Sequence, residues 1–207
     1  MTLWCATSNA GKLREFRLAA HGEVEIWALP SLQEIPPAEE TGTTFEANAA
    51  QKALYYSAHA PGMLFADDSG LEVDALGGAP GVISARFAGP AATDEANNRL
   101  LLEKLRAAAD RTARFVCVVA LAEKGRLLGT FRGAVEGRII GQPRGSNGFG
   151  YDPLFFYPPF GCTFGEVEPE RKFTVSHRGQ ALRAMLEWLR PRGGKGAAAP
   201  QGAPPRG

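Results

Sequence analysis

Apolar residues occur along the chain in two patterns, short runs and longer segments with helical spacing. Short runs rich in apolar residues predict strands at residues 2–6, 24–29, 62–66, 113–122, 126–140 and 154–158, and the run at 113–122 is continuous from Phe115 onward. Apolar positions three or four residues apart predict helices, which follow residue 11 and cover residues 43–60, 93–109 and 176–190. Strands and helices interleave, and the run at 113–122 is apolar on both faces. The sequence therefore predicts an α/β fold with a central mixed sheet.

Two of the predicted helices begin with capping signals. Thr43 is followed three residues later by Glu46, which is the spacing of a capping box. Thr93 precedes two acidic residues, which are favourable in the first turn of a helix. We therefore expect Thr43 and Thr93 to cap these two helices.

The length of 207 residues suits one domain, and we expect residues 1–190 to fold as a unit. A domain of this size buries roughly 70% of the surface of its extended chain. From about residue 191 the composition is dominated by Gly, Ala and Pro. Such a segment cannot bury enough apolar surface to offset the entropy cost of ordering, so residues 191–207 are predicted to be a disordered tail.

Net charge and cysteine usage limit which binding partners and which cellular compartment we expect. The formal net charge of +1 gives no global attraction to nucleic acid or to a membrane surface, so neither is an expected partner. No run approaches the roughly 20 apolar residues of a membrane span, and the N-terminus lacks the regions of a signal peptide. Cys5, Cys117 and Cys162 are widely spaced, which is typical of reduced thiols. We predict a cytoplasmic protein in which Cys5 and Cys117 are core residues rather than nucleophiles.

Two helix starts carry cations, which are unfavourable beside the positive end of a helix dipole. One follows a turn made of Thr7, Ser8, Asn9, Ala10, Gly11 and Lys12. The other follows Ser176 and opens with His177 and Arg178. A bound phosphate would neutralise both starts. The turn is not a P-loop, because Leu13 replaces the hydroxyl residue and the spacing is too short; an ordinary turn with a helix cap is the alternative interpretation of Thr7, Ser8 and Asn9.

Two pairs of adjacent acids lie at predicted element boundaries. Asp67-Asp68 follow a strand expected to end at Ala66, and the glycine-rich residues 70–89 after them are expected to form a long loop. Glu39-Glu40 lie in a loop that contains proline. Carboxylate oxygens suit Mg²⁺, which binds through one or two carboxylates together with substrate phosphates. An acidic turn is the alternative for Asp67-Asp68, and a solvated loop is the alternative for Glu39-Glu40.

A second glycine-rich segment, GSNGFGYDP at residues 145–153, carries two aromatic rings and an acid. Exposed rings of Phe149 and Tyr151 can stack on a base, and Asp152 can accept a hydrogen bond from a base N–H. His177 and Arg178 can donate to a keto oxygen. The alternative is that Phe149 and Tyr151 simply join the core.

Six blocks of sequence occur together in the order of one family. They read ATSNAGKLREF, EETGTTFEANAAQKA, ADDSGLEVDALGGAPGVISARFAG, TDEANNRLL, FGYDPLFF and SHRGQALRAM. In this order they resemble the Ham1-like inosine triphosphate pyrophosphatase family, whose bacterial members are called dITP/XTP pyrophosphatases, and the match covers residues 3–190. The resemblance implies an elongated fold with two lobes around a nucleotide cleft, a homodimer, and Mg²⁺-dependent cleavage of ITP, dITP and XTP to monophosphate and pyrophosphate.

The resemblance also implies roles for single residues. Asp68 is similar to the family's catalytic acid, which also contacts the metal. One glutamate of the EETG block is similar to the second metal ligand; Glu39 is favoured because the family pattern often reads Glu-x-x-Gly, and Glu40 stays open. The implied triphosphate contacts are Thr7, Ser8, Asn9, Ala10, Gly11, Lys12, Ser69 and Lys172. The implied base pocket is formed by Phe149, Gly150, Tyr151, Asp152, His177 and Arg178.

These roles define a mechanism to be tested. Asp68 is expected to orient or deprotonate a water for attack at the α-phosphorus, while Lys12 and Lys172 offset charge on the leaving pyrophosphate. Hypoxanthine and xanthine present O6 as acceptor and N1–H as donor, and adenine reverses both, leaving buried polar groups unpaired. Two other functions stay open, a Maf-like nucleotide pyrophosphatase acting on other bases and a nucleotide sensor without catalysis.

Overall fold

The computed structural model describes residues 1–190, so the tail predicted at residues 191–207 lies outside the described residues. The strands are β1 (Thr2–Cys5), β2 (Glu25–Ala28), β3 (Leu64–Val73), β4 (Thr112–Glu123), β5 (Arg126–Ile139), β6 (Phe155–Tyr157) and β7 (Cys162–Thr163). The α-helices are α1 (Ala10–Ala19), α2 (Phe45–Ser57), α3 (Asp94–Lys104), α4 (Pro169–Val175) and α5 (His177–Leu189). No helix among residues 1–190 is long and apolar enough to cross a membrane.

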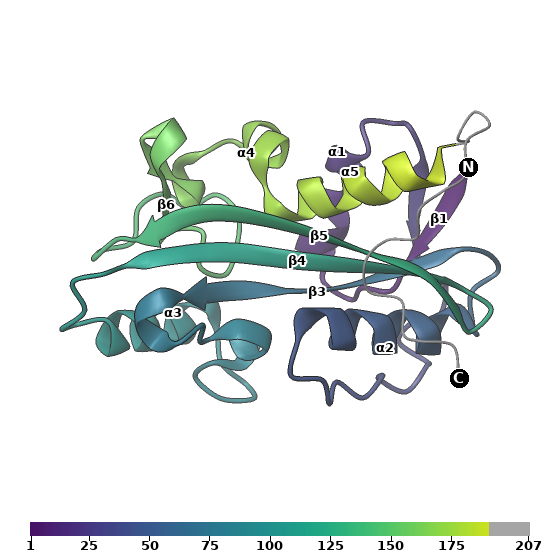
Figure 1. The fold of residues 1–207 in the computed structure, drawn as a ribbon, viewed down its shortest axis with the longest axis horizontal. Coiled ribbons are helices and arrows are strands. Elements are labelled where there is room, and N and C mark those ends of the chain that lie inside the picture. The colour runs from purple at the N-terminus through teal and green to yellow at the C-terminus, as the bar shows by residue number, and fades with distance from the viewer. Residues whose placement is uncertain (191–207) are drawn as a thin grey trace.

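All seven strands form one sheet in the order β2-β1-β3-β4-β5-β6-β7. β1 pairs in parallel with β2 and β3, whereas the pairs from β3 to β7 are antiparallel. The long strands β3, β4 and β5 run the length of the molecule, with α1, α4 and α5 on one face and α2 and α3 on the other (Figure 1). The predicted α/β class with an elongated mixed sheet is confirmed.

β3 departs from the prediction that a strand ends at Ala66. It continues through both aspartates to Val73, pairing Asp67 with Val119 and Asp68 with Val118 of β4. The apolar strand β4 supplies a complete backbone ladder, and cationic side chains pair with the two acids, so the strand can carry them. The expected long loop is therefore shorter, and it contains two 3-10 helices, η1 (Asp74–Leu76) and η2 (Gly81–Arg86).

Helix starts follow the predicted chemistry, with one shift. Thr93 caps α3 as predicted, accepting from the backbone N–H of Ala96. The cap of α2 is Thr44 rather than Thr43, because the Thr44 hydroxyl accepts from Ala47 N. The helix α4 was not predicted; it begins at Pro169, which suits the first turn of a helix.

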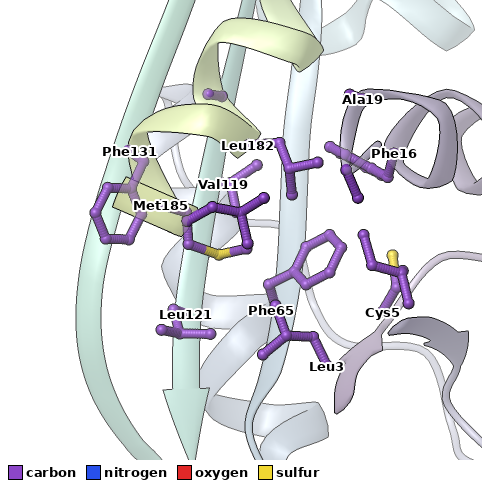
Figure 2. Packing of buried hydrophobic residues seen from close by; sticks show 14 of the residues in the cluster. Leu3, Cys5, Phe16, Ala19, Phe65, Val119, Leu121, Phe131, Leu182 and Met185 are labelled. Atoms are coloured by element: carbon purple, nitrogen blue, oxygen red, sulfur yellow. The ribbon is translucent and has the colours of Figure 1, made fainter. Parts of the chain in front are cut away.

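The hydrophobic core of residues 1–190 contains four clusters, and the two largest lie along the long strands. One packs α1 and α5 against the sheet around Phe16, Phe65 and Met185 (Figure 2). The other surrounds Leu71 and Phe155 at the opposite end of the same strands. Asp67 and Asp68 therefore lie on β3 between Phe65 of the first cluster and Leu71 of the second. Cys5 and Cys117 are fully buried in the first cluster, which confirms the prediction that they are core residues.

Candidate active site

The middle of β3 has an open edge. β1 pairs with β3 only at Leu64 and Phe65, so beyond that point β3 keeps β4 as its ladder partner on one side. Because successive side chains of a strand point to opposite faces, Asp67 and Asp68 diverge. Asp67 reaches α1, whereas Asp68 reaches α2. The strand thus delivers acids to both faces of the sheet beside the same opening.

A cavity of about 230 Å³ lies at this opening. It brings together most of the predicted site residues from distant parts of the chain: Asn9, Lys12, Glu40, Asp68, Ser69, Phe149, Gly150, Tyr151, Asp152, His177 and Arg178. Six further predicted residues do not line it: Thr7, Ser8, Ala10, Gly11, Glu39 and Lys172. The predicted phosphate turn therefore contributes to the cavity through Asn9 and Lys12.

The cation at the start of α1 is neutralised by the protein itself. Asn9 is the N-cap, and its side chain accepts from the backbone N–H of Lys12 at 2.9 Å. The Lys12 ammonium lies 2.8 Å from Asp67 Oδ2. Burial alone would raise the pKa of Asp67, but the charges of Lys12, Arg178 and Lys52 lower it to about 2. Asp67 is therefore ionised at neutral pH and holds Lys12 at the cavity.

The start of α5 is neutralised in the same way. Arg178 donates to the carboxylate of Glu15 at 2.8 Å and to the Ser69 hydroxyl at 3.0 Å. Glu15 comes from α1 and is buried. Burial alone would raise the pKa of Glu15, but Arg178 and Lys172 together lower it. Both misplaced cations are thus matched by buried carboxylates, and each ion pair links a helix start to another element.

Asp68 is held by two donors from α2. Asn48 Nδ2 donates to one carboxylate oxygen at 3.1 Å, and Lys52 Nζ donates to the other at 3.3 Å. Burial raises the pKa of Asp68 despite the opposing charge of Lys52. Conversely, burial would lower the pKa of Lys52, but Asp68, Asp67 and Glu40 raise it. Asp68 is therefore a fixed carboxylate of increased basicity that faces the cavity.

The two candidate metal ligands of the EETG block are separated by the path of their loop. Glu40 lines the cavity and lies 3.5 Å from Lys52 Nζ. Glu39 is exposed and does not line the cavity. The geometry therefore favours Glu40 as the metal ligand, whereas the family pattern favoured Glu39. Residues 1–190 contain no cluster of three or more His, Cys, Asp or Glu groups that could hold a metal. Glu40 and Asp68 each pair with Lys52 and line the same cavity, and two carboxylates of this kind suit Mg²⁺ that is bound jointly with a substrate.

The loop at residues 149–152 divides its side chains between cavity and core. Phe149 is half-buried, lines the cavity and lies under the Arg178 guanidinium, 5.0 Å from ring centre to Cζ. Tyr151 is buried in the second core cluster, and its hydroxyl donates to the Ser84 carbonyl at 2.8 Å. Its ring is packed as a core residue, which is the alternative that the sequence left open.

Lys172 lies beside the base-pocket residues rather than at the phosphate side. It is 2% exposed and contacts two carboxylates, Glu15 at 3.1 Å and Asp152 at 2.5 Å. Burial would lower the pKa of Lys172, but both carboxylates raise it. Lys172 thus positions Asp152, and its expected contact with the leaving pyrophosphate is not supported by this placement.

His177 is a buried ring at the cavity wall. It stacks on Phe115 with ring centres 4.9 Å apart, and its Nδ1 has no hydrogen-bond partner among the described residues. Burial lowers the pKa of His177 well below its usual value, and the neighbouring cations Arg178 and Lys172 lower it further. The imidazole is therefore neutral at pH 7, with one nitrogen able to donate and the other able to accept.

The comparison with known proteins follows this geometry. Residues 3–188 match the model of the Ham1 family. The chain belongs to the Ham1 family. A protein of Acidobacterium capsulatum named dITP/XTP pyrophosphatase is 51% identical over 199 residues, which cover 91% of this chain and 98% of the relative. An Exiguobacterium protein of the same name is 54% identical over 187 residues, covering 89% and 95%.

Solved Ham1-family structures have the same fold. The Staphylococcus aureus Ham1 protein superposes with a TM-score of 0.81 at 38% identity, covering 91% of this chain and 98% of that one. A structure titled nucleoside-triphosphatase or dITP/XTP pyrophosphatase from Mycobacterium abscessus gives 0.70 at 41% identity, covering 90% and 99%. The expected family and fold are thus confirmed.

Three polar residues of this Ham1-family site were not predicted from sequence: Glu15, Asn48 and Lys52. Glu15 follows Lys12 by three positions, and Asn48 and Lys52 are four apart beside the buried Ala49 and Ala53. These spacings place polar groups on the inward faces of helices, and this pattern is the sequence signal from which the three residues could have been predicted. Other unpredicted cavity residues are Gly70, Leu71, Val82, Ser84, Ala85, Arg86, Asp94, Asn97 and Phe115.

Proposed function

We propose that this protein is a nucleoside triphosphate pyrophosphatase that cleaves dITP, ITP and XTP to the monophosphate and pyrophosphate. The observation that carries the proposal is the ionic pairing of Asp68 with Lys52 and, through it, Glu40 at the mouth of the cavity. The names of the two relatives described above, dITP/XTP pyrophosphatase, support the substrate class. We further propose that the protein is cytoplasmic and forms a homodimer; light scattering of the purified protein tests the dimer.

The acidic side of the cavity is suited to the reacting phosphates. Asp68 has a raised pKa and two fixed hydrogen bonds, so it can orient a water and accept its proton during attack on the α-phosphorus. Lys12 lines the same cavity and can offset charge on the leaving pyrophosphate. Glu40 and Asp68 would hold Mg²⁺, which when bound supplies neutralisation of phosphate charge.

The opposite side of the cavity is suited to a keto purine. The neutral ring of His177 can donate one hydrogen bond to O6. Asp152 is buried, and burial raises its pKa in spite of Lys172; its carboxylate can accept from N1–H. Adenine presents a donor and an acceptor in the reversed positions, so each group would be left unpaired at a cost of about 1–3 kcal/mol.

A panel of nucleoside triphosphates with and without Mg²⁺ tests the proposal. Pyrophosphate release should be far faster from dITP, ITP and XTP than from ATP, and should require the metal. Comparable rates for dITP and ATP would contradict the base assignment. Preference for another base would favour a Maf-like activity, and tight binding without turnover would favour a sensor.

A further inference from the structure

Helix α3 contacts the base-pocket loop through its first two turns. Asp94 Oδ2 accepts from the backbone N–H of Gly150 at 2.6 Å. Asn98, four residues later on the same face, donates to the Gly150 carbonyl at 3.0 Å. Both polar groups of one residue in the loop are therefore held by two side chains of a single helix.

The same helix also holds a second segment that lines the cavity. Asn97 accepts from Ala88 N at 2.8 Å and donates to the Ala85 carbonyl at 3.1 Å. Ala85 lies in η2 and lines the cavity, as Gly150 does. Two neighbouring asparagines thus connect α3 to two separate segments of the cavity lining, and the block TDEANNRLL acquires a role that neither catalysis nor metal binding explains.

The loop depends on such contacts because its own backbone is permissive. Gly145, Gly148 and Gly150 all have positive φ angles, which glycine adopts without strain. Fixing a glycine backbone costs more conformational entropy than fixing that of any other residue. Phe149 in this loop lines the cavity and lies 5.6 Å from Lys172 as well as close to Arg178. A shift of Gly150 would therefore move the ring that borders the base.

We propose that Asp94, Asn97 and Asn98 are positioning residues that fix the placement of two cavity-lining segments, Gly150 and residues 85–88, and so set selectivity for the base. This rests on the proposed function, because selectivity is measured between a hypoxanthine and an adenine nucleotide. These residues act through the backbone of Gly150 and of residues 85–88 and take no part in proton transfer.

The test uses the full-length protein with two variants that each disrupt one hydrogen bond between α3 and Gly150. These clamp variants are Asp94→Ala and Asn98→Asp. The first removes an acceptor, and the second replaces the donor by a carboxylate of the same shape facing the Gly150 carbonyl. Asp94→Asn is the conservative variant, because its amide oxygen still accepts from Gly150. Glu103→Ala, on an exposed position of the same helix, is the matched control. Thermal melting establishes that each variant is folded before KM and kcat are measured for dITP and dATP.

Both clamp variants should raise KM for dITP by about 3–10-fold, the worth of one hydrogen bond, with kcat changed by less than about twofold. The ratio of kcat/KM for dITP over dATP should fall by a similar factor. Glu103→Ala should match the wild type, and Asp94→Asn should restore most of the selectivity that Asp94→Ala loses. Unchanged selectivity in both clamp variants, or an Asp94→Asn defect as large as that of Asp94→Ala, would overturn the inference. A wild-type protein that does not prefer dITP would instead overturn the proposed function.

Discussion

The Lys52 ammonium lies 3.3 Å from the Asp68 carboxylate, and both groups face the cavity beside β3. The pair is partly screened from water, because the side chains are 12% and 8% exposed. Burial favours the protonated acid, and Lys52 favours the carboxylate. Asp68 is therefore a carboxylate of raised pKa whose ionised form Lys52 favours, which is what the proposed chemistry requires.

Asp68→Asn should remove most turnover and keep the fold. The amide is nearly isosteric and can still accept from Lys52, but it cannot take a proton from water. We expect kcat for dITP to fall by about 10²–10⁴-fold, with dITP binding, measured by calorimetry without Mg²⁺, within a few-fold of wild type. Asp110→Asn, on an exposed loop, serves as the control, and turnover of Asp68→Asn near that of the control would contradict the assignment.

Lys52→Met should also impair turnover, because it removes a cation from the cavity and with it the charge that favours the ionised form of Asp68. A loss of at least about tenfold in kcat is expected. Lys124→Met, in the exposed turn between β4 and β5, removes a lysine remote from the cavity lining and should leave the steady-state rate unchanged. Equal rates for the two variants would show that Lys52 has no part in catalysis.

Glu40→Gln and Glu39→Gln form a matched pair for the metal site. Glu40 lines the cavity and Glu39 does not. We expect Glu40→Gln to raise the Mg²⁺ concentration for half-maximal activity at least about tenfold, the cost of losing even an outer-shell partner of a metal ligand. Glu39→Gln should require the same concentration as wild type. The reverse ranking would restore the choice suggested by the family pattern.

His177 makes the free energy of unfolding depend on pH. Its pKa is lowered in the folded protein, so below about pH 6.5 the unfolded chain binds a proton that the native state does not. Stability is therefore full above this pH and is lost as pH falls, by up to about 1.4 kcal/mol per pH unit. Urea unfolding of wild type and His177→Gln between pH 7 and 5.5 measures the difference in slope. Parallel curves would mean that His177 titrates normally.

The fold was largely predictable because its strongest signals are local. The apolar run at 113–122 and the stripe on α5 occur where predicted, since strands buried on both faces and amphipathic helices leave clear periodicities. The strand through Asp67 and Asp68 was not predictable in the same way. Its polar residues are buried only because Lys12 and Lys52 arrive from two different helices, and that compensation is tertiary.

The sequence blocks that contribute to the candidate site could be predicted, but the ion pairs between their side chains could not. The sequence predicts that a bound phosphate neutralises Lys12 and Arg178. In the structure, Asp67 pairs with Lys12 and Glu15 pairs with Arg178. The choice between Glu39 and Glu40 depends on the path of an irregular loop, for which neighbouring residues give no periodic signal. Lys172 was assigned to the phosphates, and only the packing of α4 against α1 shows that it joins Glu15 to Asp152.

Hydrolysis of dITP in ¹⁸O-labelled water tests the central claim most directly, because it reports which phosphorus the water attacks. If Asp68 orients a water toward the α-phosphorus, dIMP will carry one ¹⁸O atom and the pyrophosphate will carry none. Mass spectrometry of the two products gives the answer in a single reaction. Label in the pyrophosphate, or formation of dIDP and orthophosphate, would contradict the proposed reaction.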